Sequence, residues 1–393
     1  MTVATLPLTE SAREIAPWII ERRRHLHRHP ELSFHEEQTA AFVEAELRAL
    51  GFEAIRTRLG GNYSLIADLP GADPGRIVAL RADMDALPIQ EATEWEFQSQ
   101  NPGVSHMCGH DSHTAMLLGA ARLLMERRAE LPQTVRFIFQ GAEEKFPGGA
   151  RDVIADGGLD GVERVFGLHI DPRHDVGTIR FTDGPQMAGV DEFSITVRGV
   201  GGHAAFPHVT RDPILAASHI VVALQQIVSR RTDPLEAAVV SVTQFHGGSA
   251  FNVIPGEVTL NGTIRSFRDA MHPHFRAMMA EVAENTARAF GCEADLHQDE
   301  GYPPLVNDPE ANAAYRAAAR EVFGEENVLV MEPVMGAEDF ALYTRERPCA
   351  FAFLGCSAPH DRDRFMVHHP RFYLDEDCLW RGAAVLAGVA SGA

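Results

Sequence analysis

Two short segments carry the residue types that can bind a metal and activate water. Residues 107–113 read Met-Cys-Gly-His-Asp-Ser-His, and residues 141–144 read Gly-Ala-Glu-Glu. Thiolate, imidazole and carboxylate together suit Zn, Mn, Co or Ni better than Ca or Mg, which prefer oxygen ligands alone. A lone Cys is most often a small buried apolar residue, but core packing needs none of the polar groups around Cys108. Cys108 is therefore predicted to be a metal ligand or a nucleophile.

The glutamate pair Glu143–Glu144 follows a strongly apolar segment and precedes a glycine-rich one, residues 146–149. Two adjacent acids usually form only a solvated turn. At the end of a strand, however, adjacent side chains point in different directions. One carboxylate can then bind a metal while its neighbour moves a proton in the open cleft, as hydrolysis by a metal-bound water requires.

The elements around these segments predict an α/β fold. Residues 114–128 carry an apolar pattern that is typical of a helix and too long for a strand, and residues 134–139 are the β-branched and aromatic residues of a buried strand. A third segment, 76–80, predicts another strand, which leads to Asp85. Ligands of such sheets bind beyond the carboxyl ends of the strands, so we expect the polar side chains to meet there.

Two further histidine positions lie where they could join this site. His169 lies near the end of a strand predicted over 162–170, and His368 begins a His-His-Pro segment. Alone, the first is typical of a core or edge histidine and the second of a plain turn. Together with the other donors they support a metal site, because such a site needs several converging donors.

The pattern changes near Gly184. Residues 191–198 alternate as an antiparallel strand with one wet face would, and a helix, two strands and a second helix follow. This succession predicts a smaller α+β domain at 187–299, inserted into a discontinuous α/β domain at 1–186 and 300–393.

The inserted domain contains three candidate polar residues. His203 lies in a glycine-rich loop, where tight turns explain the glycines but not the histidine. Asn252 and Arg265 complete a polar trio on this domain. An arginine on a strand commonly faces solvent, so the residues alone leave the role of Arg265 open.

The bulk composition excludes several classes of partner. With 35 basic and 55 acidic residues the formal charge is −20, which argues against binding nucleic acid or an anionic membrane surface. The five cysteines are odd in number and show no paired spacing, which favours reduced thiols in a cytoplasmic protein. The first residues lack the basic and apolar regions of a signal peptide, and no apolar window reaches the roughly 20 residues that span a bilayer. We expect a soluble cytoplasmic protein.

In order along nearly the whole chain, a series of motifs resembles the M20 family of metallopeptidases and amidohydrolases, in its aminoacylase-like and hippurate-hydrolase-like branch. So many ordered matches are very specific for the family and much less so for the substrate. The matching segments are Leu26–Phe34, Arg81–Pro88, Met107–Thr114, Gly141–Glu144, Gly167–His169, Gly201–His208, Asn252–Pro255, Gly262–Arg265, Gly336–Phe340 and His368–Pro370.

The resemblance implies a catalytic domain with a mixed sheet that holds two divalent ions, Zn, Mn, Co or Ni. Glu143 would be the general base that activates water and later protonates the leaving amine, and Asp85 would orient a ligand imidazole. Cys108 would bridge the two ions, and the other ligands would be His110, Glu144, His169 and His368, the last preferred over His369 by its place in the motif.

For the inserted domain the resemblance implies a lid or dimerisation domain, through which the chain would form a homodimer or homotetramer. His203 would stabilise the tetrahedral oxyanion, within its own chain or across to a partner. Asn252 and Arg265 would hold the substrate, Arg265 binding a carboxylate through its fork of donors. Met107 departs from the family pattern, where a small residue is common, and this departure bears on substrate choice.

The predicted function is metal-dependent hydrolysis of the amide bond of N-acyl amino acids. The nearest alternative is a metallo-carboxypeptidase or dipeptidase acting on small peptides. Two alternatives of other classes are a metal-free thiol hydrolase using Cys108 and a non-catalytic binding protein on the same scaffold. The intact Glu143 argues against the binding protein.

Overall fold

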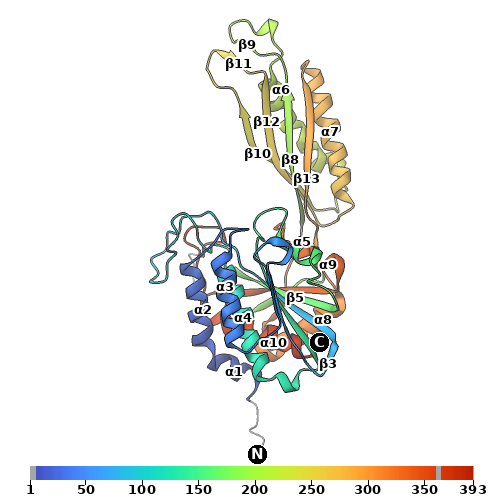
Figure 1. Ribbon diagram of the computed structural model, residues 1–393. Helices are drawn as coiled ribbons and strands as arrows, with labels where there is room; N and C mark the ends of the chain where they lie inside the picture. Colours follow the sequence, from blue (N-terminus) through green and yellow to red (C-terminus); the bar gives the residue numbers. More distant parts are fainter. Residues whose placement is uncertain (1–5, 360–363, 393) are drawn as a thin grey trace, which may run out of the picture. The chain divides into compact units, whose positions relative to one another are not determined.

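The computed structural model describes residues 6–359 and 364–392, which divide into two compact units (Figure 1). Within those described residues, unit 1 is drawn from Met1–Gly184, Val306–Glu332 and Asp339–Ala393. Unit 2 consists of Pro185–Leu305 and Pro333–Glu338. The chain therefore leaves unit 1 and returns to it, as expected for an inserted domain. The connecting segments include strands β7 (Gly184–Met187) and β14 (Leu305–Asn307).

Unit 1 is built on a mixed sheet of eight strands, which confirms the predicted fold class. The four central strands are parallel to one another, and the strand next to them on each side is antiparallel. Parallel central strands end at one edge of the sheet, where a ligand site is expected. The strand order is β1 (Ile55–Thr57), β2 (Leu65–Leu69), β4 (Gln133–Gln140), β3 (Asp73–Asp83), β5 (Val162–Asp175), β16 (Cys349–Ser357), β6 (Ile179–Phe181) and β15 (Val328–Val330).

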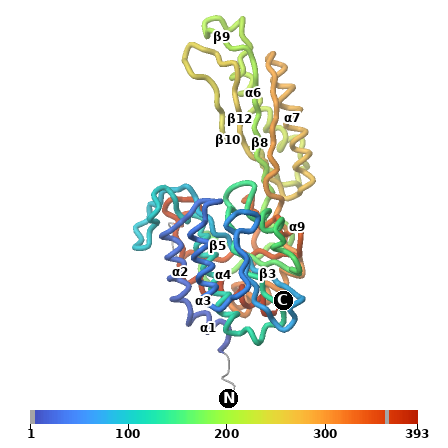
Figure 2. The backbone as a smooth tube through the Cα atoms, in the orientation of Figure 1, coloured from blue at the N-terminus to red at the C-terminus, as the bar shows by residue number. Residues whose placement is uncertain are grey.

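Helix α4 (His110–Glu126) is the central helix of unit 1. It contacts β3, β4 and β5, and also the helices α2, α3 and α10. Figure 2 shows it beside α2 and α3. Because it is covered on several sides, nearly all of its residues are buried and its sequence is apolar almost all round. The other helices of unit 1 are α1 (Leu8–Glu14), α2 (Ala16–Arg28), α3 (Glu37–Ala49), α5 (Gly149–Ala155), α8 (Pro309–Phe323), α9 (Ala341–Glu346) and α10 (Asp377–Gly392).

Unit 2 is an antiparallel sheet with two helices and its own core. The strand order is β10 (Ala238–Gly247), β12 (Glu257–Ser266), β8 (Gly189–Arg198) and β13 (Glu293–Tyr302). Helices α6 (Pro213–Gln226) and α7 (Met271–Ala289) bury Ile220, Leu224, Phe275 and Met279 in a common core with the sheet. A separate pair of short strands, β9 (Gly202–His203) and β11 (Val253–Ile254), completes the unit.

None of the helices in the described part of the chain is both long and apolar enough to span a membrane.

Candidate active site

Two groups of side chains that could bind a metal lie toward the carboxyl ends of the central strands of unit 1. Cys108 Sγ lies 3.4 Å from His169 Nε2, and together with His110 these residues offer donor atoms within 4.8 Å of one another. Cys108, Glu144 and His368 form a second such group. Because Cys108 belongs to both groups, the arrangement suits a thiolate that bridges two ions. The structure thus brings together all five side chains that were predicted as ligands.

The start of α4 positions two of these donors. Gly109, just before the helix, has a φ of +89°, and a Cβ at this position would lie 2.8 Å from the side chain of Ile170. Glycine is the residue that allows this close, left-handed turn. The turn sets Cys108 immediately ahead of the helix and His110 at its first residue.

The orientation of His110 and Glu144 fits a metal ion. His110 Nδ1 lies 3.2 Å from Asp85 Oδ1, to which it donates its proton, so Nε2 is the nitrogen that remains for a ligand bond. His110 Nε2 and Glu144 Oε1 are both buried, and neither has a hydrogen-bond partner among the described residues, although Glu144 Oε1 lies 3.2 Å from His368 Nε2 as an ion-pair contact. Buried polar atoms are nearly always partnered, and a cation between these two would satisfy both.

His169 is held in the form that binds metals. Its Nδ1 donates to the backbone oxygen of Ile170 at 2.7 Å, which leaves the lone pair of Nε2 facing Cys108. Burial lowers the pKa of His169, so the neutral imidazole is favoured. A neutral ring with a fixed tautomer is the usual state of a histidine ligand.

His368 reaches the site from the loop that follows β16. Its Nε2 lies 3.2 Å from Glu144 Oε1. Its backbone has a φ of +68°, a left-handed conformation that costs a non-glycine residue about 1–3 kcal/mol. The backbone N–H of His368 donates to the oxygen of Met107 at 2.6 Å, which ties this loop to the segment that carries Cys108.

Asp85 orients two ligand residues. Besides its contact with His110, its Oδ2 accepts hydrogen bonds from the backbone N–H of Glu144 at 3.0 Å and from Ser33 Oγ at 2.7 Å. Burial opposes ionisation of Asp85, but the hydrogen bond and charge of His110, with these other donors, hold its pKa below the usual range. Sequence reasoning identified Asp85 but not Ser33, which lies in the matched segment Leu26–Phe34.

The charges at the site favour a bound cation and disfavour a free thiol nucleophile. Burial raises the pKa of the Cys108 thiol well above its usual value, and the charges of Glu144 and Glu143 raise it further. Only a thiolate is strongly nucleophilic, and a coordinating metal would deprotonate this thiol. Burial also lowers the pKa of His110, but Asp83, Asp85 and Glu144 outweigh it and raise the pKa to about 10. This excess of negative charge is what a cation would neutralise.

A third possible donor group, Asp83, His110 and His113, does not fit a metal ion. His113 Nδ1 lies 2.6 Å from Asp83 Oδ1, and its Nε2 accepts the backbone N–H of Ile170 at 3.0 Å. Both ring nitrogens are therefore occupied. Burial lowers the pKa of His113 to about 4, so this neutral, doubly bonded ring supports the site without binding metal.

The predicted base Glu143 lies beside a buried polar network. Its Oε1 accepts the backbone N–H of Asp339 at 3.4 Å. The carboxylate of Asp339 in turn accepts from Arg81 Nη2 at 2.8 Å and from the backbone N–H of Ala150 at 3.0 Å. Sequence reasoning matched the motif that contains Asp339 but gave it no role. The available signal was Arg81, a charged residue inside an otherwise apolar strand.

In unit 2 the structure brings two of the three predicted residues together. His203 on β9 pairs with Val253 on β11, and the backbone N–H of Ala204 donates to the oxygen of Asn252 at 3.0 Å. Arg265 lies near the far end of β12, roughly 25 Å from its first residue at 3.3 Å per residue. Arg265 is half-buried there, and its Nη1 donates to the oxygen of Met335 at 2.9 Å.

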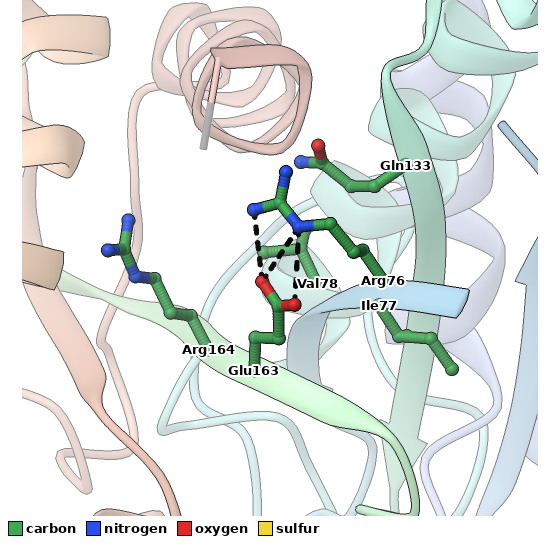
Figure 3. A pocket seen from close by; sticks show the side chains of 6 residues that line it. All are labelled: Arg76, Ile77, Val78, Gln133, Glu163 and Arg164. Atoms are coloured by element: carbon green, nitrogen blue, oxygen red, sulfur yellow. Dashed lines mark hydrogen bonds and ion pairs between the residues drawn. The ribbon is translucent and has the colours of Figure 1, made fainter. Parts of the chain in front are cut away.

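A separate pocket in unit 1 lies at the opposite, amino ends of β3, β4 and β5 (Figure 3). Its charged residues are largely paired with each other, since Arg76 Nη2 lies 3.0 Å from Glu163 Oε2. Ligand sites of parallel sheets lie at the carboxyl ends, so we assign no site to this pocket. Its lining residues are Arg76, Ile77, Val78, Gln133, Glu163 and Arg164.

The fold and the site define a class of protein, an α/β protein with adjoining metal-donor groups around a shared cysteine. Residues 79–391 match the family described as Peptidase family M20/M25/M40. The chain is 46% identical over 299 residues to an N-acyl-L-amino acid amidohydrolase of Geobacillus stearothermophilus, covering 76% of this chain and 80% of the relative. It is 42% identical over 378 residues to an N-acetylcysteine deacetylase of Bacillus subtilis, covering 95% and 96%.

A solved structure agrees with these sequence relatives. It is a Bacillus subtilis protein described as a dinuclear metal binding peptidase from the M20 family. It is 38% identical to this chain, covers 96% of this chain and 98% of its own, and superposes with a TM-score of 0.82. The chain belongs to Peptidase family M20/M25/M40, which confirms the family that the sequence motifs predicted.

Proposed function

We propose that this protein is a metal-dependent amidohydrolase that cleaves the amide bond of N-acyl amino acids. The observation that carries the proposal is the pair of donor groups that share Cys108, next to the buried carboxylate of Glu143. The relatives named N-acyl-L-amino acid amidohydrolase and N-acetylcysteine deacetylase support this substrate class. The relative described as dinuclear and metal binding supports two ions, for which the donors suit Zn, Mn, Co or Ni.

The residues of unit 1 divide the work of hydrolysis. Cys108, His110 and His169 would hold one ion, and Cys108, Glu144 and His368 the other. When bound, two such ions polarise a carbonyl oxygen and lower the pKa of water. Glu143 takes the proton of the attacking water and later gives it to the leaving amine, which is the usual task of a general base that turns into an acid.

The residues of unit 2 would act on the other parts of the substrate. His203 would donate a hydrogen bond to the oxyanion, and Asn252 would help to hold the substrate. Arg265 would bind the free carboxylate of the amino acid through donors other than Nη1. His203 lies on β9, which pairs with β11 shortly before β12 begins, whereas Arg265 lies near the end of β12, roughly 25 Å along the strand from Glu257. One copy of unit 2 would then hold these two side chains too far apart to reach one small substrate. We therefore propose that His203 acts on the substrate bound by a partner chain.

Such sharing needs an oligomer, and unit 2 offers a surface for one. Strand β10 lies at an edge of the sheet, with β12 as its only neighbour in the described sheet. Exposed edges and apolar patches mark surfaces that pair with another chain. Large hydrophobic residues are exposed on and near α6, β10 and β11, namely Ile214, Leu215, Val222, Phe245, Phe251 and Val253. These features support the predicted homodimer or homotetramer.

A substrate panel tests the proposed activity against its nearest alternative. Hydrolysis rates would be compared for N-acetyl and N-benzoyl amino acids, free dipeptides and longer peptides. The proposal predicts the highest kcat/KM for an N-acyl amino acid with a free carboxylate. Faster cleavage of dipeptides or of the last bond of peptides would favour the dipeptidase or carboxypeptidase. No turnover of any substrate by the metal-loaded protein would contradict the enzymatic function.

A further inference from the structure

Glu36 lies buried directly behind the turn that carries both active-site glutamates. Its side chain is 0% exposed. Its Oε1 accepts the backbone N–H of Ala142 at 2.7 Å. The packing is so close that a Cβ added to Gly141 would lie 2.9 Å from the same oxygen. The carboxyl group of Glu36 therefore touches the two residues that immediately precede Glu143.

This turn has an unfavourable backbone conformation. Ala142 has a φ of +56°, in the left-handed region that disfavours any residue with a side chain. Such a conformation persists only where the surroundings hold it, and it is common at functional sites. The backbone oxygen of Ala142 accepts the N–H of Gly149 at 2.9 Å, and the N–H of Gly141 donates to Ser64 Oγ at 3.0 Å. The N–H of Ala142 itself is held by Glu36.

A second left-handed residue also interacts with the same carboxylate. Phe34 has a φ of +68°. Its backbone amide, like that of Ala142, favours the charged form of Glu36. Phe34 follows Ser33, which donates to Asp85 at 2.7 Å. Glu36 thus contacts the turn that carries the two glutamates and belongs to the segment whose Ser33 supports Asp85.

Core packing alone does not explain a carboxyl group at this position. Burial and the charge of Asp85 raise the pKa of Glu36 to about 7, so the fold carries an electrostatic cost that an apolar side chain would avoid. An apolar side chain would lack an acceptor for the N–H of Ala142. The backbone conformation of Ala142 sets the direction of the side chains of Glu143 and Glu144. The acceptor oxygen of Glu36 therefore affects where both glutamates point.

We propose that Glu36 is a positioning residue that holds the turn Gly141–Glu144 in its left-handed conformation and so places Glu144 and Glu143 for their tasks. This inference rests on the proposed function, because it takes Glu144 as a metal ligand and Glu143 as the base. Residues that orient metal ligands from behind commonly change metal affinity or activity 10- to 100-fold when they are replaced.

The test is a calorimetric titration of metal-free protein with Zn²⁺, combined with kcat for an N-acyl amino acid. Glu36→Ala removes the acceptor and is predicted to weaken the binding of at least one ion roughly 10- to 100-fold and to lower kcat. Glu36→Gln keeps an acceptor oxygen and is predicted to stay close to wild type. Adding Ala142→Gly to Glu36→Ala is predicted to restore part of the metal affinity, because glycine adopts a positive φ without steric cost.

Two further variants make the result decisive. Glu36→Leu fills the volume without an acceptor, so it tests the same loss if Glu36→Ala does not fold. Glu31→Ala is the matched control, since Glu31 accepts the N–H of Thr39 at 2.8 Å on the same stretch of chain but does not contact the turn. We expect wild-type metal affinity for this control.

The outcomes separate this inference from the function on which it rests. Wild-type affinity in both Glu36→Ala and Glu36→Leu, or no recovery on adding Ala142→Gly, would overturn the role of Glu36. Failure of the wild-type protein to bind any Zn²⁺ would instead overturn the proposed function.

Discussion

Glu143 and Glu144 are neighbours in the chain, but they face different partners. Glu144 Oε1 lies 3.2 Å from His368 Nε2, whereas Glu143 Oε1 accepts the backbone N–H of Asp339 at 3.4 Å. This difference follows from the alternation of side-chain directions beyond β4. It supports the separate roles proposed for the pair, a metal ligand and a base, although donor atoms of both glutamates lie within 4.8 Å of each other and of His110.

Replacing each glutamate by glutamine should separate these roles. Glu143→Gln removes the base, so kcat should fall roughly 10²- to 10⁴-fold while the metal content stays at the wild-type level. Glu144→Gln weakens a ligand, so metal should be lost as well. Elemental analysis of the purified variants, alongside their kcat, checks the prediction. Equal metal loss in the two variants would contradict the assignment.

Arg265 offers a test of substrate recognition. Burial lowers the pKa of its guanidinium, although arginine remains charged at neutral pH. Arg265→Ala should raise KM for substrates with a free α-carboxylate and leave KM for their amide-capped analogues nearly unchanged, because the lost fork pairs only with the charge. Steady-state kinetics on matched pairs of substrates decide the matter. An equal rise of KM for both kinds of substrate would argue for a structural role.

Glu36 also predicts a pH dependence of stability. Its folded pKa of about 7 exceeds the ordinary value of 4.5, so between these two values the folded state keeps a proton that the unfolded chain has released. Stability then falls as pH rises through this window, by up to about 3 kcal/mol for a shift of this size. Glu36→Gln cannot titrate, so its free energy of unfolding relative to wild type should rise between pH 4.5 and pH 7.5. Urea unfolding of the metal-free proteins measures this difference, and a parallel pH dependence would contradict it.

At the scale of elements, the local sequence pattern predicted the secondary structure that individual segments form. The strands expected at 134–139 and 191–198 match β4 and β8, because one carries a continuous apolar pattern and the other a regular alternation. The helix expected over 114–128 is α4, which already begins at His110. Strand β13 was not predicted, because this edge strand is largely polar and exposed.

The residues of the candidate site could be predicted from the sequence, but the backbone conformations and contacts that position them could not. The family motifs identified all five donors that form the two groups around Cys108. The backbone conformations that aim them, such as the positive φ of Ala142 and His368, have no local sequence signal at a non-glycine residue. The pairing of Arg81 with Asp339 joins residues 258 positions apart, so local patterns could not reveal it.

His203, on the small sheet of β9 and β11, allows a test of the role of the inserted unit. His203→Ala should lower kcat roughly 10²- to 10³-fold, the usual cost of losing an oxyanion donor, with metal content intact. Under conditions where subunits exchange, mixing His203→Ala with Glu143→Gln protein should restore part of the activity, because some sites then combine both intact residues. Light scattering establishes the assembly. No recovery after confirmed exchange would mean that His203 acts within its own chain.

At the scale of the whole molecule, the two units explain different parts of the activity. Unit 1 contains the five predicted ligands and the predicted base, which lie on β5, at the start of α4 and in the segments that follow β4 and β16. Unit 2 contributes the residues proposed to recognise the substrate and an apolar surface suited to assembly. Metal binding should therefore depend on unit 1 alone, whereas turnover should depend on both units.

The account depends most on a bridged two-metal centre at Cys108, and cobalt substitution tests it directly. Metal-free protein loaded with Co²⁺ should bind two ions per chain, show a thiolate-to-cobalt charge-transfer absorption and regain hydrolysis of an N-acyl amino acid. Cys108→Ser should lose the absorption and bind the ions more weakly, because a hard hydroxyl replaces a soft thiolate. Full activity in a sample free of metal, or a charge-transfer band that persists in Cys108→Ser, would contradict the account.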